Sequence, residues 1–215
     1  MFDTEREPRK PHIRSVWTVG LDLGQATDFT AIVAVEQTTS IGWTGDPTDD
    51  PTYNVRHIER LPLGTPYPRQ VERVAALLNT PELVTAQLVV DHTGVGRAVV
   101  DLLRAANLPK GLTAVSIHGG DQVTHDRGDY RVPKRDLVAA VAVLLATERL
   151  KIAAGLPEAA TLQAELLGFR VKIDPTTAHD SYAAWREGAH DDLVLALALA
   201  VWHAREVGSG QVLIL

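Results

Sequence analysis

The chain has 215 residues, of which 45% are hydrophobic and 22% charged, and its formal net charge is −6. These values are typical of one globular domain that is large enough to bury its own core. The absence of cysteine excludes thiol catalysis, disulfides, Fe–S clusters and cysteine-liganded zinc, so any metal must bind carboxylates or histidines. No apolar run approaches the roughly 20 residues of a membrane span, and no signal peptide is evident. We therefore expect a cytoplasmic protein with no membrane partner.

The hydrophobic pattern predicts three strands, then alternating strands and helices. Strands are expected at 16–23, 30–37, 53–60, 87–91, 112–117 and 169–173. Helices are expected at 68–79, 94–107, 133–150, 161–167 and 192–205. The Gly-, Pro- and Asp-rich segment 40–51 is expected to form a hairpin loop, and 118–132 a polar loop. The predicted organisation is a loose arm at 1–14, one domain at 15–207 and a tail at 208–215.

This order of elements predicts an α/β fold with a mixed sheet flanked by helices. The three leading strands indicate an antiparallel meander. The later strands, each separated from the next by a helix, indicate parallel additions through crossover connections. The last helix is apolar on almost every side, which predicts that it is buried.

Acidic residues occur at positions where an unpaired buried carboxylate would be costly. Asp22 lies in an apolar strand, Asp91 ends another, and Asp191 and Asp192 begin the last helix. A shared cation would explain this placement, and all-oxygen ligands suit Mg²⁺ or Mn²⁺. Two such ions about 3.5–4 Å apart would activate a water and stabilise the leaving oxygen in phosphodiester cleavage.

Each of these acids also has a structural explanation. Asp22 would begin a turn, Asp91 would cap the turn that follows its strand, and Asp191 and Asp192 would cap the last helix. For one acid alone the structural explanation is the better one. The occurrence of all of them in this order of elements favours the metal site.

Four stretches of the chain resemble the nuclease domain of the large terminase subunit of tailed bacteriophages, the DNA-packaging motor. In the order found in that family, they are Gly20–Ala31 (GLDLGQATDFTA), Val90–Gly96 (VDHTGVG), Val132–Leu137 (VPKRDL) and Arg186–Ala196 (REGAHDDLVLA). The resemblance extends over residues 16–204, and the order of the four stretches makes it specific. It implies a ribonuclease-H-like, RuvC-like fold and a metal-dependent endonuclease, a hydrolase that cleaves double-stranded DNA during viral genome packaging.

The resemblance also implies catalytic roles for individual residues. Asp22 and Asp91 carry over as ligands of two Mg²⁺ or Mn²⁺ ions, and the third ligand comes from the stretch His190-Asp191-Asp192. Consecutive helix positions point about 100° apart, so one of the two aspartates is expected to face the ions. We favour Asp192, with Asp191 and His190 as direct or outer ligands. A capping or packing role is the alternative for His190.

Four basic residues are candidates for binding DNA. Lys134 and Arg135 begin a predicted helix, where a cation gains nothing from the helix dipole, and this placement suggests contact with phosphate. An ordinary solvated pair is the alternative. Arg127 and Arg131 in the preceding glycine-containing loop would extend the same basic strip.

The resemblance implies further partners, namely a packaging ATPase domain and the portal of the capsid. A complete large terminase contains an ATPase domain, whereas this sequence has no Walker-type loop. The sequence is therefore expected to correspond to the nuclease part alone, acting in the host cell cytoplasm.

Three other functions remain open from the sequence. A Holliday-junction resolvase of the same fold also uses a carboxylate cluster and a divalent metal. An ATP-binding domain of the actin, Hsp70 or sugar-kinase type begins with a similar Asp-Leu-Gly turn, here Asp22-Leu23-Gly24. A catalytically silent docking module would keep the fold and bind a packaging partner.

Overall fold

The computed structural model describes residues 12–24, 26–93, 96–172 and 191–206. Its strands are β1 (His12–Asp22), β2 (Thr30–Ile41), β3 (Thr52–Leu61), β4 (Gln87–Asp91), β5 (Leu112–His118), β6 (Thr124–Asp126), β7 (Asp129–Pro133) and β8 (Leu150–Ile152). Its helices are α1 (Tyr67–Leu78), α2 (Gly96–Ala105), α3 (Lys134–Ala146), α4 (Ala159–Lys172) and α5 (Asp192–Glu206). None of the helices in these ranges is both long and apolar enough to cross a membrane.

The described strands form one mixed sheet in the order β6-β7-β5-β4-β1-β2-β3-β8. β1, β2 and β3 pair in antiparallel fashion, and β6 pairs in the same way with β7. β4 is parallel to β1, β5 to β4, β7 to β5, and β8 to β3. The predicted class is thereby confirmed: the fold is α/β and ribonuclease-H-like, with an antiparallel meander extended by parallel strands.

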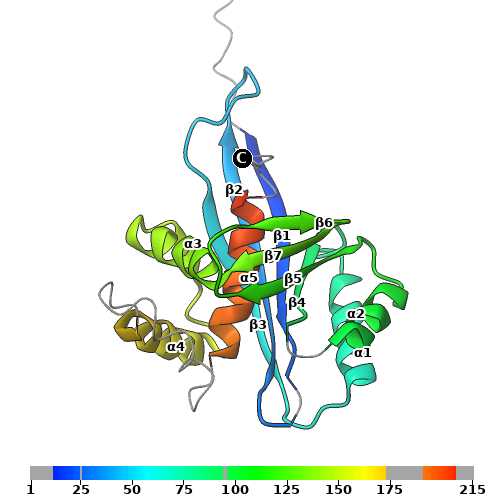
Figure 1. Cartoon of the computed structure of the whole chain (residues 1–215). Helices are drawn as coiled ribbons and strands as arrows, with labels where there is room; N and C mark the ends of the chain where they lie inside the picture. Colours follow the sequence, from blue (N-terminus) through cyan, green and yellow to red (C-terminus); the bar gives the residue numbers. More distant parts are fainter. Residues whose placement is uncertain (1–11, 25, 94–95, 173–190, 207–215) are drawn as a thin grey trace, which may run out of the picture.

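Helices cover both faces of the sheet (Figure 1). α3, α4 and α5 pack on one face, and α1 and α2 pack on the other. α5 lies directly against β1 and β2 and is covered from outside by α3 and α4, so its residues from Asp192 to Ala204 are almost all buried. This position explains why the last helix is apolar on nearly every side, as expected from the sequence.

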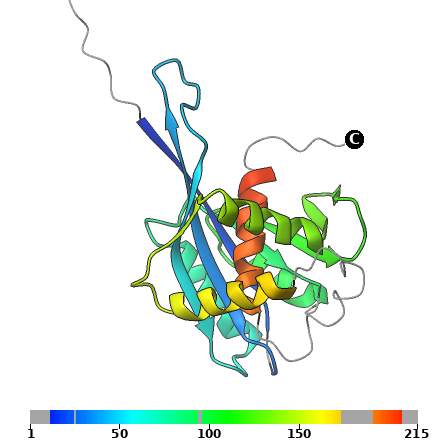
Figure 2. The same cartoon turned by 90° about the vertical axis from the view of Figure 1, so that its left-hand side faces the viewer.

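The three meander strands are longer than the rest of the sheet and project beyond the body of the molecule (Figure 2). The expected hairpin loop joins β2 to β3 in this projection, and its Trp43 side chain is 88% exposed. β1 begins at His12, so residues 12–14 of the expected arm belong to this strand. The domain therefore begins no later than His12, and its outer boundary at 207 stays a prediction.

The polar segment 118–132 contains structure that the sequence analysis did not predict. Instead of a loop, the chain forms the hairpin β6–β7, whose turn places Arg127 at φ 50° and Gly128 at φ 91°. Two successive positive φ values are those of a type I′ turn, which matches the twist of the flanking strands. The hairpin was missed because β6 is short and wholly polar.

Two further predictions differ from the structure, one in where a helix ends and one in the type of element. The helix expected at 133–150 ends at Ala146, where Glu148 adopts a φ of 56°, and Leu150–Ile152 then forms the edge strand β8. The strand expected at 169–173 is helical up to Lys172, as a continuation of α4. A short run that alternates apolar and polar residues fits either period, and the helix already under way continues through it.

Candidate active site

The strand pairing brings Asp22 and Asp91 to neighbouring positions. β1 and β4 are parallel, and their register ends with Leu21 opposite Val90, so the next residues along each strand are Asp22 and Asp91. Leu21 and Val90 point into the core beneath α1 and α2. Since side chains alternate along a strand, both aspartates belong to the opposite face, on which α5 packs. Neighbouring strands lie about 4.8 Å apart, so the two carboxylates share one edge of the sheet.

Asp91 is held in a fixed orientation by the turn that follows its strand. Its side chain is buried, and Oδ1 accepts hydrogen bonds from the Thr93 backbone N–H (2.8 Å) and from the Thr93 hydroxyl. The Thr93 hydroxyl oxygen in turn accepts the Ile117 N–H from β5 (2.8 Å). Asp91 therefore has the turn-capping role considered from the sequence, and this role orients its carboxylate.

The chain leaves β1 after Asp22 through a tightly packed glycine. A Cβ on Gly24 would lie 2.2 Å from the Asp28 carbonyl oxygen, so no larger residue fits there. The Thr30 hydroxyl donates to the Gly24 carbonyl (2.9 Å), and the buried Gln70 amide donates to the same oxygen (2.9 Å). These bonds fix the backbone immediately beyond Asp22.

The two aspartates at the start of α5 have different environments. Asp191 precedes the helix, is half-buried, and accepts the Leu195 N–H at its carbonyl (2.9 Å). Asp192 is the first residue of α5 and is buried, with only 7% of its surface exposed. Its Oδ2 accepts a hydrogen bond from Nη2 of Arg60 on β3 (3.3 Å). His190, the third member of the predicted stretch, lies outside the described residues.

Arg60 joins Asp192 to a further buried acid, Glu165 of α4. Nη2 of Arg60 contacts Oε1 of Glu165 as well as Asp192, and the side chains of all three residues are at most 13% exposed. The other Glu165 oxygen accepts the Val194 N–H in the first turn of α5 (3.2 Å). Burial raises the pKa of Glu165 to about 7; Arg60 and the Val194 N–H oppose this shift, and Asp192 and Asp191 add to it.

Arg60 and Glu165 were not identified from the sequence. One signal for Glu165 was available, because it lies three residues after Leu162 and one before Leu166, on the stripe of α4 that faces the core. A charged residue within such a stripe indicates a buried partner. No comparable signal marks Arg60, which is one of several charged residues along β3.

Carboxylate oxygens suit a divalent cation such as Mg²⁺ or Mn²⁺, and Asp22 and Asp91 lie at the ends of neighbouring strands. Among the described residues, however, no group of three or more His, Asp or Glu side chains is arranged to hold an ion. Asp192 is bonded to Arg60. The ligand roles of Asp22, Asp91, Asp192, Asp191 and His190 stay predictions.

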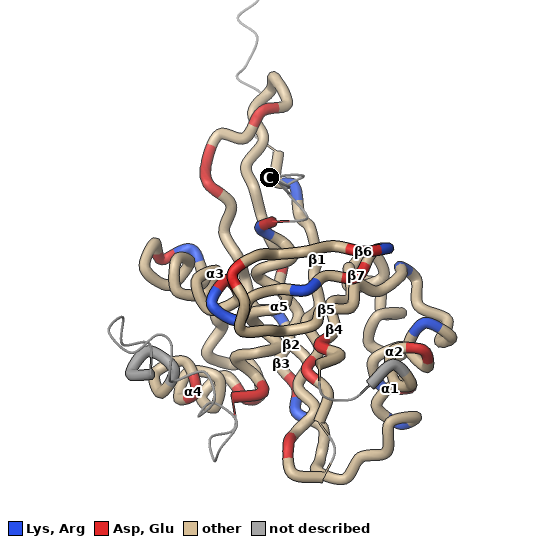
Figure 3. Tube along the Cα trace, in the orientation of Figure 1, with Lys and Arg blue, Asp and Glu red and all other residues tan. Residues whose placement is uncertain are grey.

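The four candidate DNA-binding residues are not gathered into one strip. Lys134 and Arg135 begin α3, directly after β7, at the same edge of the sheet as the end of β4. Arg131 pairs in register with Ser116, on the face opposite Tyr130 and Val132 and therefore opposite Asp91. Arg127 lies in the turn at the far end of the hairpin. Figure 3 shows Lys and Arg positions spread over several elements.

Arg135 is already engaged within the molecule. Its guanidinium donates to the Asp121 carboxylate (2.6 Å) and to the Asp121 carbonyl (2.7 Å), although half of the side chain is exposed. This ion pair offsets part of the positive charge at the start of α3. A phosphate contact by Arg135 would therefore compete with this ion pair.

Comparisons with known proteins place few constraints on this site. No protein-family profile matches the chain, and no curated protein matches it. A solved structure that does match is T. thermophilus RuvC in complex with Holliday junction substrate, with 13% identity and a TM-score of 0.39. That alignment covers 91% of this chain and 97% of the RuvC chain. At this level of similarity the fold assignment rests on the strand order and directions described above.

Proposed function

We propose that this chain is a metal-dependent endonuclease that cleaves double-stranded DNA. The observation that carries the proposal is the pairing of β1 with β4, which puts Asp22 and Asp91 on adjacent strands, at one edge and on one face. Asp192 begins the helix that packs on this same face. Carboxylates from two strand ends and a helix start would together provide the oxygen ligands of a divalent cation.

In this proposal the protein supplies ligands and positions the DNA. Asp22 and Asp91 would hold the ions, with Asp192 as the third ligand and Asp191 as an outer one. When bound, two Mg²⁺ or Mn²⁺ ions supply water activation and charge stabilisation at the leaving oxygen. Lys134 would contact a phosphate of the bound strand. Since phosphate contacts carry no sequence information, we expect little preference among bases.

The four ordered stretches described in the sequence analysis support a more specific role, as the nuclease of a phage DNA-packaging terminase. In that role the partners would be double-stranded DNA, a packaging ATPase domain and a portal. The motor would bring the DNA to the nuclease and restrain its cutting, so the isolated chain would cleave slowly. The alternative within the same reaction class is a resolvase that acts on branched DNA.

Plasmid cleavage tests the proposed activity. We expect supercoiled plasmid to be nicked and linearised with Mn²⁺ or Mg²⁺ and to stay intact with EDTA. Asp22→Asn and Asp91→Asn should each lower the rate by about 100-fold or more, because even outer-ligand changes cost about 10–100-fold. Asp101→Asn is the matched control, since Asp101 is exposed on α2 and pairs only loosely with Arg104, at 3.8 Å.

Two results would contradict the proposal. Equal cleavage by the wild type and both variants would indicate a contaminating nuclease, and no cleavage with either metal would remove the basis for an enzyme. Faster cleavage of a four-way junction than of a linear duplex would favour the resolvase alternative.

A further inference from the structure

Arg60 is an arginine whose side chain is largely buried. Its side chain is 13% exposed, and its guanidinium carbon lies 4.9 Å from the centre of the Phe29 ring, which covers one side of the group. Nη2 bonds to both Glu165 and Asp192. Nε is buried and makes no hydrogen bond within the described residues. The guanidinium is therefore fixed by packing and by two carboxylates.

The sheet register relates this group to the candidate metal site. Asp22 pairs with Ala31 of β2, and Ala31 pairs with Arg60 of β3, so the three residues form one row across the sheet on one face. Two strand spacings separate Asp22 from Arg60, or about 10 Å. Asp192 projects from α5 onto the same face and is bonded to the arginine end of this row.

Asp192 therefore faces two possible cationic partners. A divalent cation between Asp22 and Asp91 and the guanidinium of Arg60 would both be attracted to its carboxylate. In a poorly solvated region the two cations would also repel each other strongly. Binding of a metal ion through Asp192 thus requires the bond to Arg60 to weaken, while Glu165 is placed to retain the arginine.

We propose that Arg60 is a positioning residue that competes with the divalent cation for Asp192. In the cation-free protein it holds Asp192 against β3, and when the cation binds, Arg60 stays with Glu165 and releases Asp192. The inference rests on the proposed function, because it assumes that Asp192 is a metal ligand. It predicts that Arg60 lowers the metal affinity of the site, whereas an arginine that only braced the ligand would raise it.

Calorimetric titration of the DNA-free protein with MnCl₂ tests the competition without measuring cleavage. Arg60→Gln should bind Mn²⁺ about tenfold more tightly than wild type, since a hydrogen bond to a charged group need not be broken. Arg60→Lys keeps the charge but carries it on a shorter side chain, without the guanidinium whose Nη2 contacts both carboxylates. It should therefore also bind Mn²⁺ more tightly than wild type, by a smaller factor.

Two controls separate competition from general charge effects. Arg73→Gln removes the same charge from a residue that pairs with Glu59 on the other face, and its Mn²⁺ affinity should match wild type. Glu165→Gln leaves Arg60 with Asp192 as its remaining charged partner among the contacts described above, so Mn²⁺ should bind more weakly. If one Arg60 variant does not fold, the Mn²⁺ affinity of the other Arg60 variant, compared with that of wild type, tests the competition.

The outcomes distinguish this inference from the proposed function. Unchanged or weaker Mn²⁺ binding in both Arg60 variants, with binding in wild type, would overturn the role of Arg60 and leave the nuclease proposal standing. Mn²⁺ binding in the Arg60 variants but not in wild type would support the competition between Arg60 and the cation most strongly. No Mn²⁺ binding in any of these proteins would overturn both.

Discussion

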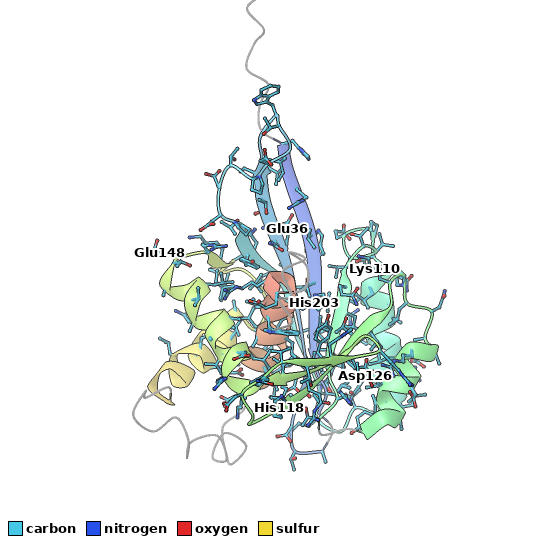
Figure 4. The ribbon with its side chains drawn as sticks, turned by 45° about the horizontal axis from the view of Figure 1, so that its top comes forward. Glu36, Lys110, His118, Asp126, Glu148 and His203 are labelled. Carbon is cyan, nitrogen blue, oxygen red and sulfur yellow. The ribbon has the colours of Figure 1, made fainter. Side chains whose placement is uncertain are left out.

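At the scale of single residues, His203 shows the cost of a polar group inside α5. It lies in the interior of the molecule (Figure 4), and its ring neighbour along the helix is Trp202. Nδ1 is buried and has no hydrogen-bond partner within the described residues. Burial, with a smaller contribution from Lys110, lowers the pKa of His203 to about 4. The folded protein therefore keeps this imidazole neutral under conditions in which the unfolded chain protonates it.

This lowered pKa predicts a pH dependence of stability. Between pH 6.5 and about 4 the unfolded chain binds more protons at His203 than the folded chain, so its contribution to stability is complete above pH 6.5 and is lost as the pH falls. The full shift corresponds to about 3 kcal/mol. Glu165, with its raised pKa, acts in the opposite direction between pH 4.5 and about 7. The prediction therefore concerns the difference in the pH dependence of stability between wild type and a variant that lacks His203.

Urea unfolding in EDTA from pH 7 to pH 5 measures this difference. The free energy of unfolding of His203→Gln should fall less, or rise more, than that of wild type as the pH decreases. His125→Gln, in the exposed hairpin strand β6, is the control and should follow wild type. Identical pH profiles for wild type and His203→Gln would show that His203 titrates normally.

At the scale of elements, the contact between β1 and α5 determines how closely the helix approaches the site. A Cβ on Gly20 would lie 1.9 Å from the Ala196 carbonyl oxygen, so glycine is required for this approach. Gly20 is two residues before Asp22, and Ala196 is one helical turn after Asp192. The contact therefore also sets the distance between the two predicted ligands.

Gly20→Ala should consequently destabilise the protein by about 1–3 kcal/mol or more, as is typical of overpacking against backbone. Gly155→Ala is the matched control, because nothing lies within 4 Å of the position of its Cβ. Thermal unfolding of the two variants beside wild type makes the comparison. A Gly20→Ala protein as stable as Gly155→Ala would mean that α5 can move away from β1 at little cost.

The sequence predicted those elements that consist of continuous apolar runs bounded by polar residues or glycine. The buried strands β1, β2 and β4 and the helix α5 were found for this reason. β6 and β8 have three residues each, and their pairing depends on neighbours distant in the chain, so no local pattern reveals them. Short strands at the edges of a sheet are the elements that local patterns identify least well.

The same reasoning explains which parts of the site were predicted. Asp22 and Asp91 stood out because each interrupts or ends an apolar strand, and each follows the last paired residue of two neighbouring strands, Leu21 and Val90. The bond between Arg60 and Asp192 joins residues 132 positions apart. Such a contact depends on how β3, α4 and α5 pack together, and this packing is not readable from spacing in one sequence.

At the scale of the whole molecule, the net charge of −6 opposes general binding to DNA. In the proposed function, DNA binding would therefore depend on a few cations placed near the site and on metal ions that neutralise the carboxylates. Lys134 lies at the relevant edge, whereas Arg127 is at the far end of the β6–β7 hairpin. Lys134 is thus expected to contribute more than Arg127 to DNA affinity, although both were candidates from the sequence.

Duplex binding followed by fluorescence anisotropy at several salt concentrations tests this inequality, with Ca²⁺ present. Lys134→Ala should weaken binding and lower the slope of log K against log salt by about 1, as expected for one lost phosphate contact. Arg127→Ala should bind as wild type does. Arg56→Ala is a second control, since this residue pairs with Glu36 on the projecting strands. An equal loss of DNA affinity in Lys134→Ala and Arg127→Ala would indicate that DNA binding depends on overall charge and not on the position of Lys134.

The central claim is that Asp22 and Asp91 bind a divalent cation on the face covered by α5. Anomalous diffraction from crystals soaked in MnCl₂ tests it most directly, because manganese is located without reference to activity. The account predicts a manganese peak between the two carboxylates, at ligand distances of about 2.2 Å, and its loss in Asp22→Asn. A fully soaked crystal with no peak at this edge of the sheet, or with a peak that persists in Asp22→Asn, would contradict it.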